Sequence, residues 1–410
     1  MHKKKRAQVT VYIILGVIVL FLSILLFNLK AATKEGIDLK NIAEAQKIPK
    51  EIRPITNYIT THLDDAAKKG LLFIGMQGGY IYKWQGGPIP DCNCSDSGKA
   101  ISYGDYMVYY GIHKDKEDHY NYWFHEPENY PWIVYPYPNF AEVNPSKNFK
   151  GIGGYFGTNE LPPLNGSSPD SIESQLMLYI TNYLKENIDL KIFDEQGFEI
   201  KDSGMDVSVI IGENDITVFL EYPLIINKTI TNKITKVRYF YTNPQIRLKK
   251  VYEFTDEIIN KDTTNILFNI SNPNNNKNGI WIEKEEDVYE HDDVIVIRDD
   301  KSMLYAEPYT FQFARENRYP ALRYLPITKI TFFGVQSVIG AKITEDRINP
   351  KADDPDEDNI KFAYDPPLKY TITQSDFDRG YVELTVYAEE EGNAESKDWQ
   401  KLTIDPSAES

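Results

Sequence analysis

A short acidic stretch near the C-terminal end of the sequence supplies several oxygen ligands. It places five carboxylates in six positions, Asp353, Asp354, Asp356, Glu357 and Asp358. Calcium takes about 6 to 8 oxygen ligands, and extracellular modules bind it at roughly 0.1 to 1 mM. The remaining ligands would have to come from other loops, which the sequence does not place. The pattern therefore favours a solvated acidic loop, with a calcium site as the alternative; no other cofactor is expected.

The segment from Tyr103 to Phe140 is dense in tyrosine and tryptophan. These side chains combine a large rigid face with a polar tip, so they are favoured at protein interfaces and on platforms that stack sugars. Burial inside the domain explains them equally well and is the favoured interpretation. Should some be exposed, the candidate contacts for a partner protein or a glycan are Trp123, Tyr130, Trp132, Tyr135 and Tyr137.

Familiar catalytic motifs are missing from the sequence. It has no His-Glu-x-x-His zinc helix, no Gly-x-Ser-x-Gly elbow and no Walker loop, so no catalytic residue is predicted. The histidines at 113, 119 and 125 are six residues apart, which does not place them on one helical face, and we expect surface or packing roles. For Cys92 and Cys94, free thiols, pairing between chains and a strained disulfide all stay open.

Four Asn-x-Ser/Thr sequons occur, where chance gives about three. They are candidate glycosylation sites on any side of a membrane that has a glycosylating machinery. Their asparagines are Asn93, Asn165, Asn227 and Asn269.

The elements that must position these residues follow an N-terminal apolar segment. Val9 to Phe27 is a run of nineteen residues without charge, preceded by a basic cluster at residues 2–6. At about 1.5 Å per residue such a helix nearly spans a bilayer core of about 30 Å. Positive charge resists translocation, so residues 1–29 are predicted to be a cytoplasmic tip and a retained membrane helix, with the rest of the chain outside. A long cleaved signal is the alternative.

Beyond the span, residues 30–50 are polar and are predicted to form a stalk, and residues 51–320 an α+β domain. Helices are expected from Pro54 to about Ile74, from an N-cap at Ser168 followed by Pro169, and from about Arg247 to Ile259. Residues 80–165 should hold loops and short strands. Further strands are predicted in VSVIIG, ITVFLEYPLII, KITKVRYFYT, DVIVIRD and YTFQFA.

Residues 321–410 show no helical pattern and a run of short β segments: ITKITFFGVQSV, IKFAY, KYTITQ, YVELTVYAEE and WQKLTI. Three features resemble the end of a cadherin-like or immunoglobulin-like β-sandwich. They are an Asp354-Pro355-Asp356 turn before a strand, a Gly380-Tyr381 step that opens a long alternating strand, and a final strand through Leu402-Thr403-Ile404. The resemblance covers about a fifth of the chain. It implies an all-β sandwich module.

The N-terminal half resembles a family of uncharacterised single-span surface proteins from small-genome archaea. The likeness is carried by KKRAQVTVYIILG, GLLFIGMQGGYI, VSVIIGENDITVFLEYPL and EPYTFQFA. No activity comes with it. The junction Lys5-Arg6-Ala7-Gln8-Val9 resembles the class III signal of archaeal type IV pilins, which implies cleavage between Ala7 and Gln8. The sequence departs from that pattern at Tyr12, where pilins usually carry a glutamate.

Taken together, these features predict a non-enzymatic, membrane-anchored surface protein that acts in adhesion or in the cell envelope. Its partners would be the lipid bilayer, through residues 9–27, and other surface proteins or glycans; self-assembly stays open. The formal charge of −16 argues against a nucleic-acid partner. The alternatives are a pilin-like filament subunit and an extracellular glycan hydrolase. A hydrolase would need two carboxylates about 5 to 9.5 Å apart in an aromatic cleft, and Glu126 and Glu128 are its candidates.

Overall fold

The computed structural model describes residues 48–90, 98–113, 157–265, 267–322, 325 and 327–409. The predicted membrane helix at 9–27 and nearly all of the predicted stalk lie outside these residues. Within them, no helix is both long enough and apolar enough to cross a bilayer. The chain forms two compact units, each made of the described residues of several segments: Met1–Phe73, Ile81–Asp91 and Pro163–Lys249 in the first, and Ile74–Tyr80, Cys92–Pro162 and Lys250–Ser410 in the second.

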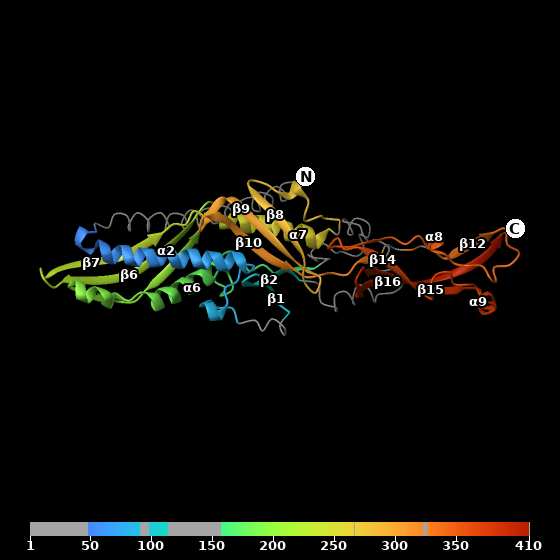
Figure 1. The fold of residues 1–410 in the computed structure, drawn as a ribbon, viewed down its shortest axis with the longest axis horizontal. Coiled ribbons are helices and arrows are strands. Elements are labelled where there is room, and N and C mark those ends of the chain that lie inside the picture. Colours follow the sequence, from blue (N-terminus) through green and yellow to red (C-terminus); the bar gives the residue numbers. More distant parts are fainter. Residues whose placement is uncertain are drawn as a thin grey trace, which may run out of the picture. The chain divides into compact units, whose positions relative to one another are not determined.

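The first unit combines two helices with a four-stranded antiparallel sheet (Figure 1). Strand β6 (Ile216–Lys228) lies at the centre of the sheet. On one side it pairs with β7 (Lys233–Thr242), and on the other with β5 (Asp206–Ile211) and then β4 (Phe198–Asp202) along its length. The predicted hairpin of β5 and β6 and the strand that follows it are thus confirmed.

Helix α2 (Arg53–Met76) confirms the helix predicted from Pro54 to about Ile74. Its buried positions recur every three or four residues, as expected for one apolar face: Ile55, Ile59, Leu63, Ala66, Ala67, Leu71 and Ile74. Gly70 allows the second helix to approach closely, since a Cβ there would lie 2.9 Å from Leu176 Cδ2. The helix and the sheet are joined by the Thr242 hydroxyl, which donates to Asp64 Oδ1 over 2.7 Å.

Helix α6 (Ile172–Asn187) starts later than the sequence indicated, so the N-cap prediction at Ser168 is wrong. The N-cap is Ser171, whose Oγ accepts from the Ser174 N–H over 3.2 Å. Residues 168–171 form a turn instead, closed by the Ser171 N–H donating to the Ser168 carbonyl over 3.1 Å. Ser168 and Ser171 are both of a type that favours the N-cap position, and the helix begins after the second.

The second unit contains a sheet with the strand order β1-β2-β10-β9-β8, and β3 pairs with β2 at its edge. The central pair, β2 and β10, runs parallel, and the other pairs are antiparallel. Strands β9 and β10 confirm the predictions from DVIVIRD and YTFQFA. The bounds are β1 Ala100–Tyr103, β2 Tyr106–His113, β3 Thr158–Asn159, β8 Ile280–Tyr289, β9 Asp292–Leu304 and β10 Glu307–Arg315.

Helix α7 (Leu248–Thr264) confirms the third predicted helix but continues past the expected end at Ile259. Along the helix, the hydroxyls of Thr255 and Thr263 donate to the carbonyls four residues earlier, of Val251 and Ile259. The chain also forms short 3₁₀ turns: η1 Lys50–Ile52, η2 Lys83–Gln85, η3 Leu190–Gln196 and η4 Pro273–Asn275.

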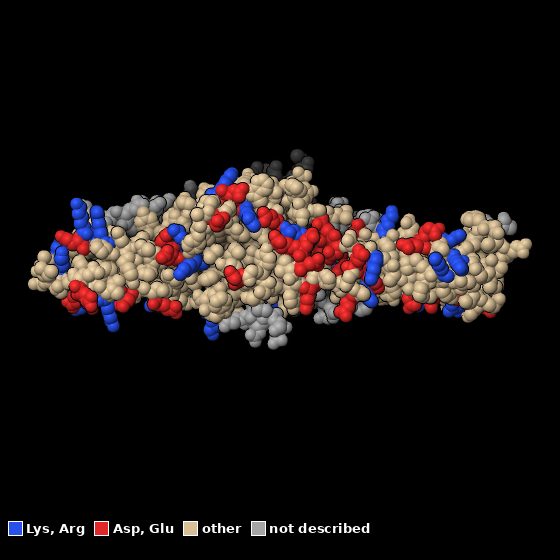
Figure 2. Space-filling model, in the orientation of Figure 1, with Lys and Arg blue, Asp and Glu red and all other residues tan. Residues whose placement is uncertain are grey.

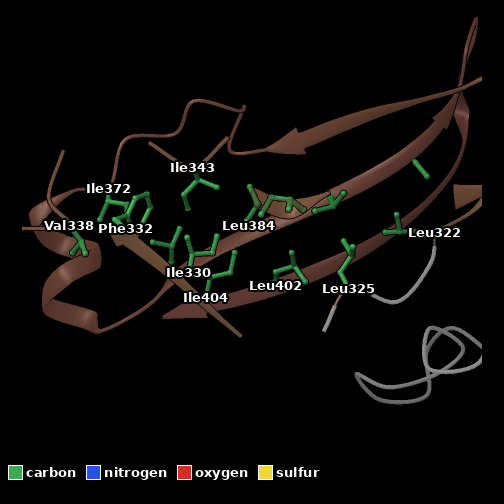
Figure 3. Packing of buried hydrophobic residues seen from close by; sticks show 14 residues of the cluster. Leu322, Leu325, Ile330, Phe332, Val338, Ile343, Ile372, Leu384, Leu402 and Ile404 are labelled. Atoms are coloured by element: carbon green, nitrogen blue, oxygen red, sulfur yellow. The ribbon is translucent and has the colours of Figure 1, made fainter. Parts of the chain in front are cut away.

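The C-terminal strands form a four-stranded sheet of order β12-β16-β15-β14 and a two-stranded pair, β11 with β13. The exposure of β15 alternates along its length, which confirms the strand predicted after Gly380-Tyr381. Figure 3 shows the apolar side chains of these strands gathered into one cluster, with Phe332, Leu384 and Leu402 among them. The bounds are β11 Ala321–Leu322, β12 Lys329–Phe333, β13 Ala352–Asp353, β14 Ile360–Asp365, β15 Val382–Glu390 and β16 Asn393–Glu409. The described chain is mostly β-sheet, with sandwich-like sheets in this part.

Two short helices contradict the expectation of a purely β C-terminal region. Helix α8 (Glu345–Ile348) and helix α9 (Gln374–Arg379) interrupt the strands. The segment KYTITQ, predicted as a strand, forms only a bridge between Thr371 and Lys342 before α9 begins. A capping box between Thr373 and Asp376 starts α9 and outweighs the β-branched residues ahead of it.

Candidate metal centre

Two buried arginines, one at the last residue of β10 and one three residues beyond it, form ion pairs in the interior of the second unit. Arg315 and Arg318 have side chains that are 1% and 0% exposed. Arg318 Nη2 lies 2.9 Å from Asp262 Oδ2 and 2.7 Å from Asp356 Oδ1. Arg315 Nη2 lies 2.7 Å from Asp293 Oδ2. Buried charges are tolerated only when they are paired in this way.

Lys284 is the third cation of this cluster. Lys284 Nζ lies 3.4 Å from Asp293 Oδ2 and donates to the Asp356 carbonyl over 3.0 Å. Three cations therefore face the three carboxylates of Asp262, Asp293 and Asp356. Burial opposes ionisation of Asp356, but the charges and hydrogen bonds of Arg318 and Arg315 outweigh it and hold its pKa below the usual range. Asp356 is committed to the arginines and is not available to a metal ion.

Three other carboxylates meet beside this cluster. One oxygen from each of Asp354, Asp358 and Glu390 lies within 4.8 Å of the others. Asp354 is 8% exposed and Glu390 2%. The two aspartates come from the loop that follows β13, and the glutamate is the last residue of β15. The pairing of β15 with β16 shifts register between Glu389 and Glu390, and such irregularities commonly re-aim a side chain.

The two oxygens of Asp354 have different surroundings. Oδ1 accepts from the backbone N–H groups of Asp356 and Asp358, over 2.8 and 3.1 Å. Oδ2 is buried and has no hydrogen-bond partner in the part of the chain that the structure describes. An unsatisfied buried oxygen of this kind costs about 1 to 3 kcal/mol, more if it is charged.

Glu390 is held by neutral donors. Its Oε2 accepts from Asn317 Nδ2 over 2.8 Å and from Asn393 Nδ2 over 3.2 Å, and Ser396 Oγ donates to Oε1. Such donors orient a carboxylate without neutralising it. They are the kind of outer contact that fixes the ligands of a metal ion.

The electrostatics of the triad favour the protonated forms of its carboxyl groups. Burial, followed by the charge of Asp356, raises the pKa of Asp354 to about 8. Burial, Asp356 and Asp293 raise the pKa of Asp358 to about 6, although Lys284 acts in the opposite direction. Burial also raises the pKa of Glu390. A divalent cation among the three oxygens would reverse these shifts, because it favours the ionised forms.

The donor set fits a hard cation. All three ligands are carboxylate oxygens, without the histidine or cysteine that zinc prefers. Oxygens bound to one calcium at about 2.3 to 2.6 Å can lie up to about 5 Å apart, which accommodates the observed separation. Backbone carbonyls and water would complete the coordination.

The structure corrects the acidic-loop prediction in two respects. The favoured expectation of a solvated loop is wrong for Asp354 and Asp356, which are buried. Of the five carboxylates proposed for calcium, only Asp354 and Asp358 join the triad, while Asp353 and Glu357 do not. The third ligand, Glu390, was missed because it lies on another strand. Its only sequence signal is the acidic run just before the turn that follows β15.

The other predicted site residues are distributed unevenly. The five aromatic candidates Trp123, Tyr130, Trp132, Tyr135 and Tyr137 lie outside the described residues, as do Asn93, Ala7, Gln8 and both cysteines. Asn165 and Asn269 are exposed. Asn227 lies within β6, paired on both sides, and its Nδ2 donates to Glu199 Oε2 over 3.5 Å. His113 contacts Glu316, with Nδ1 lying 2.8 Å from Oε2.

Comparison with known proteins finds weak structural likenesses to this chain. No protein-family model and no curated protein matches it. Among solved structures it is similar to PcdhgB3 EC1-4, at 10% identity and a TM-score of 0.17, over 55% of this chain and 70% of that one. It is also similar to the extracellular cadherin domains 1–4 of protocadherin gamma B7, at 10% identity and a TM-score of 0.17, over 56% and 71%. Scores this low carry no argument about fold or function.

Proposed function

We propose that this chain is a non-enzymatic, membrane-anchored surface protein of the adhesion or cell-envelope class, and that calcium orders its C-terminal strands. The observation that supports the proposal is the triad of Asp354, Asp358 and Glu390, in which Asp354 and Glu390 are buried and Asp354 Oδ2 has no hydrogen-bond partner among the described residues. Neighbouring backbone and side-chain groups hold Asp354 and Glu390 in place, which suits a structural ion better than a reactive one.

The calcium affinity of such a site relates the proposed calcium binding to the proposed location outside the cell. Sites of this kind in extracellular modules bind calcium at roughly 0.1 to 1 mM, a level found outside cells. At 1 mM calcium, a site with a Kd of about 0.1 mM stabilises the folded state by about 1.4 kcal/mol. The apolar segment at residues 9–27 and the basic cluster before it would place the triad on that side of the membrane.

Calcium at the triad would tie the loop after β13 to the end of β15. The same loop carries Asp356, which Arg318 already holds. One short loop would then be fixed on one side by an ion and on the other by an arginine. The antiparallel neighbours β14, β15 and β16 have the arrangement of the C, F and G strands of an immunoglobulin-like sandwich, which supports a surface module of that class.

The test is protease digestion of intact cells that express the full chain with a C-terminal epitope. We expect digestion to remove everything beyond the membrane segment. About 2 mM calcium, compared with EDTA, should slow the loss of the epitope. Asp354→Asn should abolish this calcium protection, and Asp300→Asn, at an exposed position, should retain it.

Two outcomes would count against the proposal, each against a different part. Protection of the whole chain in intact cells, with digestion after lysis, would refute the surface location. Equal digestion rates in calcium and in EDTA would refute the structural calcium site while leaving the location standing.

A further inference from the structure

The hairpin of β6 and β7 ends in an exposed apolar patch on the first unit. Ile230, in the turn, is 83% exposed, which is more than any other large apolar side chain of the described residues. Ile234, at the start of β7, is 63% exposed, and Ile225, near the end of β6, is 43% exposed. Turns are usually built from glycine, proline, asparagine, aspartate or serine, so the turn itself does not require an isoleucine. We call these three residues the isoleucine tip.

Strand pairing places Ile225 and Ile234 on the same face of the sheet. Ile234 pairs with Asn227, and Ile225 pairs with Lys236, so the two isoleucines are diagonal neighbours. Ile226, between Ile225 and Asn227, is 1% exposed, which shows that the opposite face of β6 meets the core. The isoleucine tip therefore lies on the solvent side of the hairpin, where burial within its own unit does not account for it.

The hairpin is basic, although the chain as a whole carries a formal charge of −16. The stretch between Glu221 and Glu253 contains seven lysines and arginines and neither aspartate nor glutamate. Lys228 and Lys233 stand on either side of the turn and pair with each other across the two strands. A lysine side chain can bury its alkyl stem against apolar surface while its ammonium group stays in a polar layer. An isoleucine turn flanked by lysines thus has the amphipathic character of a segment that lies in a membrane interface.

The chain enters the first unit beside the isoleucine tip. Glu51, in η1 just before α2, lies 3.0 Å from Lys233 at the start of β7, measured from Oε2 to Nζ. Figure 1 shows the start of α2 and the turn of the hairpin at the same end of this unit. Twenty residues, 28–47, separate the predicted membrane span from Ile48, and they can extend over at most about 70 Å. A bilayer that holds the span is therefore within reach of the isoleucine tip, and the tether raises its effective concentration there.

The surroundings of the hairpin carry both signs of charge. Glu51 and Glu199 are ion-paired with Lys233 and Lys201, over 3.0 and 3.5 Å. The neighbouring 3₁₀ turn η3 contains one lysine and two acidic residues. Figure 2 shows Lys, Arg, Asp and Glu side chains projecting at this end of the unit. The excess of positive charge therefore comes from the hairpin itself, which is the part that carries the isoleucines.

We propose that the isoleucine tip rests on the same bilayer that anchors the chain. Ile230 and Ile234 enter the boundary between lipid headgroups and acyl chains, and the flanking lysines extend their ammonium groups to the lipid phosphates. This inference depends on the anchor at residues 9–27 in the proposed function, and it does not depend on calcium at the triad. The first unit then lies against the membrane surface, and residues 30–50 do not lift it away.

The test is fluorescence quenching on the full chain, reconstituted in phosphatidylcholine vesicles with and without phosphatidylglycerol. Cys92 and Cys94 are replaced by serine, and Thr231→Cys, at an exposed position of the turn, carries a nitrobenzoxadiazole dye. We expect lipids that are spin-labelled near the headgroup to quench the dye. Phosphatidylglycerol should increase the quenching, and added salt should remove that increase. Flotation of the same vesicles measures the anchoring of the chain separately.

Substitutions in the isoleucine tip measure its own contribution. The triple substitution Ile225→Ser, Ile230→Ser and Ile234→Ser should lower the population of chains with a quenched dye by about tenfold. All three positions are exposed, so the triple variant should fold, which its thermal unfolding verifies. Leu178→Ser, at an apolar position of α6 that is 40% exposed, is the matched control and should retain the quenching.

The outcomes separate this contact from the anchor. A chain that floats with the vesicles while its dye stays unquenched would overturn the contact and leave the anchor standing, whereas a chain that does not float would overturn both. A blue-shifted dye that lipids do not quench would assign the isoleucine tip to a protein surface and overturn the bilayer contact. Equal quenching in the triple variant and in Leu178→Ser would also overturn it. So would a glycan on Asn227, the partner of Ile234, in mass spectra of the chain from its native membrane.

Discussion

Arg318 contacts Asp356 twice, through its side chain and through its own backbone. Nη2 lies 2.7 Å from Oδ1, and the Arg318 N–H donates to Oδ2 over 2.6 Å. Because one carboxylate receives both groups, it fixes the direction in which the chain leaves β10 as well as the position of the guanidinium. The same guanidinium continues to Asp262, on helix α7.

Replacing Arg318 by methionine should therefore be strongly destabilising. Asp262 and Asp356 would lose a shared cation in a buried site, and breaking such a pair costs about 3 to 5 kcal/mol. Urea unfolding of the full chain in detergent measures the change. The control is Arg298→Met, which breaks an exposed pair with Glu283 and should cost no more than about 1 kcal/mol. A loss for Arg318→Met no larger than that of the control would contradict the role given to the cluster.

Stability in the absence of calcium should fall as the pH rises. The pKa of Asp354 is raised from 3.8 to about 8 and that of Asp358 from 3.8 to about 6, so the folded state binds these protons more tightly than the unfolded state. The resulting stabilisation is complete below pH 3.8 and is lost as the pH rises towards 8. Asp376, whose pKa is lowered to about 2, loses its stabilising effect only at more acidic pH.

Urea unfolding in EDTA between about pH 5 and pH 9 would measure this slope. With saturating calcium the decline should flatten or reverse, since the ion competes with protons for the same carboxylates. A free energy of unfolding that is independent of pH in EDTA would show that the triad does not titrate in this range.

Asp354→Asn should change stability in opposite directions with and without calcium. The amide oxygen can still accept from the N–H groups of Asp356 and Asp358, while the buried charge is removed. In EDTA at about pH 8 we expect a gain of about 1 to 3 kcal/mol. In calcium the variant should lose the ion's contribution, and its melting temperature should no longer respond to calcium. A variant that melts below the unaltered chain in EDTA would refute the unsatisfied state of Oδ2.

Gly75→Ala should disrupt the end of α2. A Cβ at Gly75 would lie 2.2 Å from the Thr310 carbonyl oxygen, which belongs to the backbone of β10 and cannot rotate away. We expect a loss of about 2 to 4 kcal/mol in thermal or urea unfolding. Gly70→Ala is the comparison, because its Cβ would meet side-chain atoms of Leu176 and Tyr179, at 2.9 and 3.0 Å, in place of a strand backbone, and alanine favours the helix. Equal losses of stability in the two variants would mean that the contact with the Thr310 backbone does not make Gly75 a special position.

Residues with a local periodic signal were predictable, and residues joined across the chain were not. The apolar spacing of α2 and the alternating hairpin of β5 and β6 each follow from a dozen or so neighbouring residues. Helices α8 and α9 are too short to show a period, so only the Thr373 cap marked the second of them. Two residues of the triad, Asp354 and Asp358, could be predicted from the sequence because they lie in one acidic stretch. Glu390 could not, because only the pairing of β15 with its neighbours brings it close to them.

The parallel pairing of β12 with the end of β16 has a mechanical consequence. Five consecutive residues, Lys329 to Phe333, run alongside Asp405 to Glu409. Tension that enters through the chain before β12 and leaves through the far end of β16 pulls these two strands past each other along their length. All the hydrogen bonds between them then carry the load together, whereas a hairpin pulled at its open end would lose them one at a time. The geometry suits a chain that has to hold its form while it is being stretched.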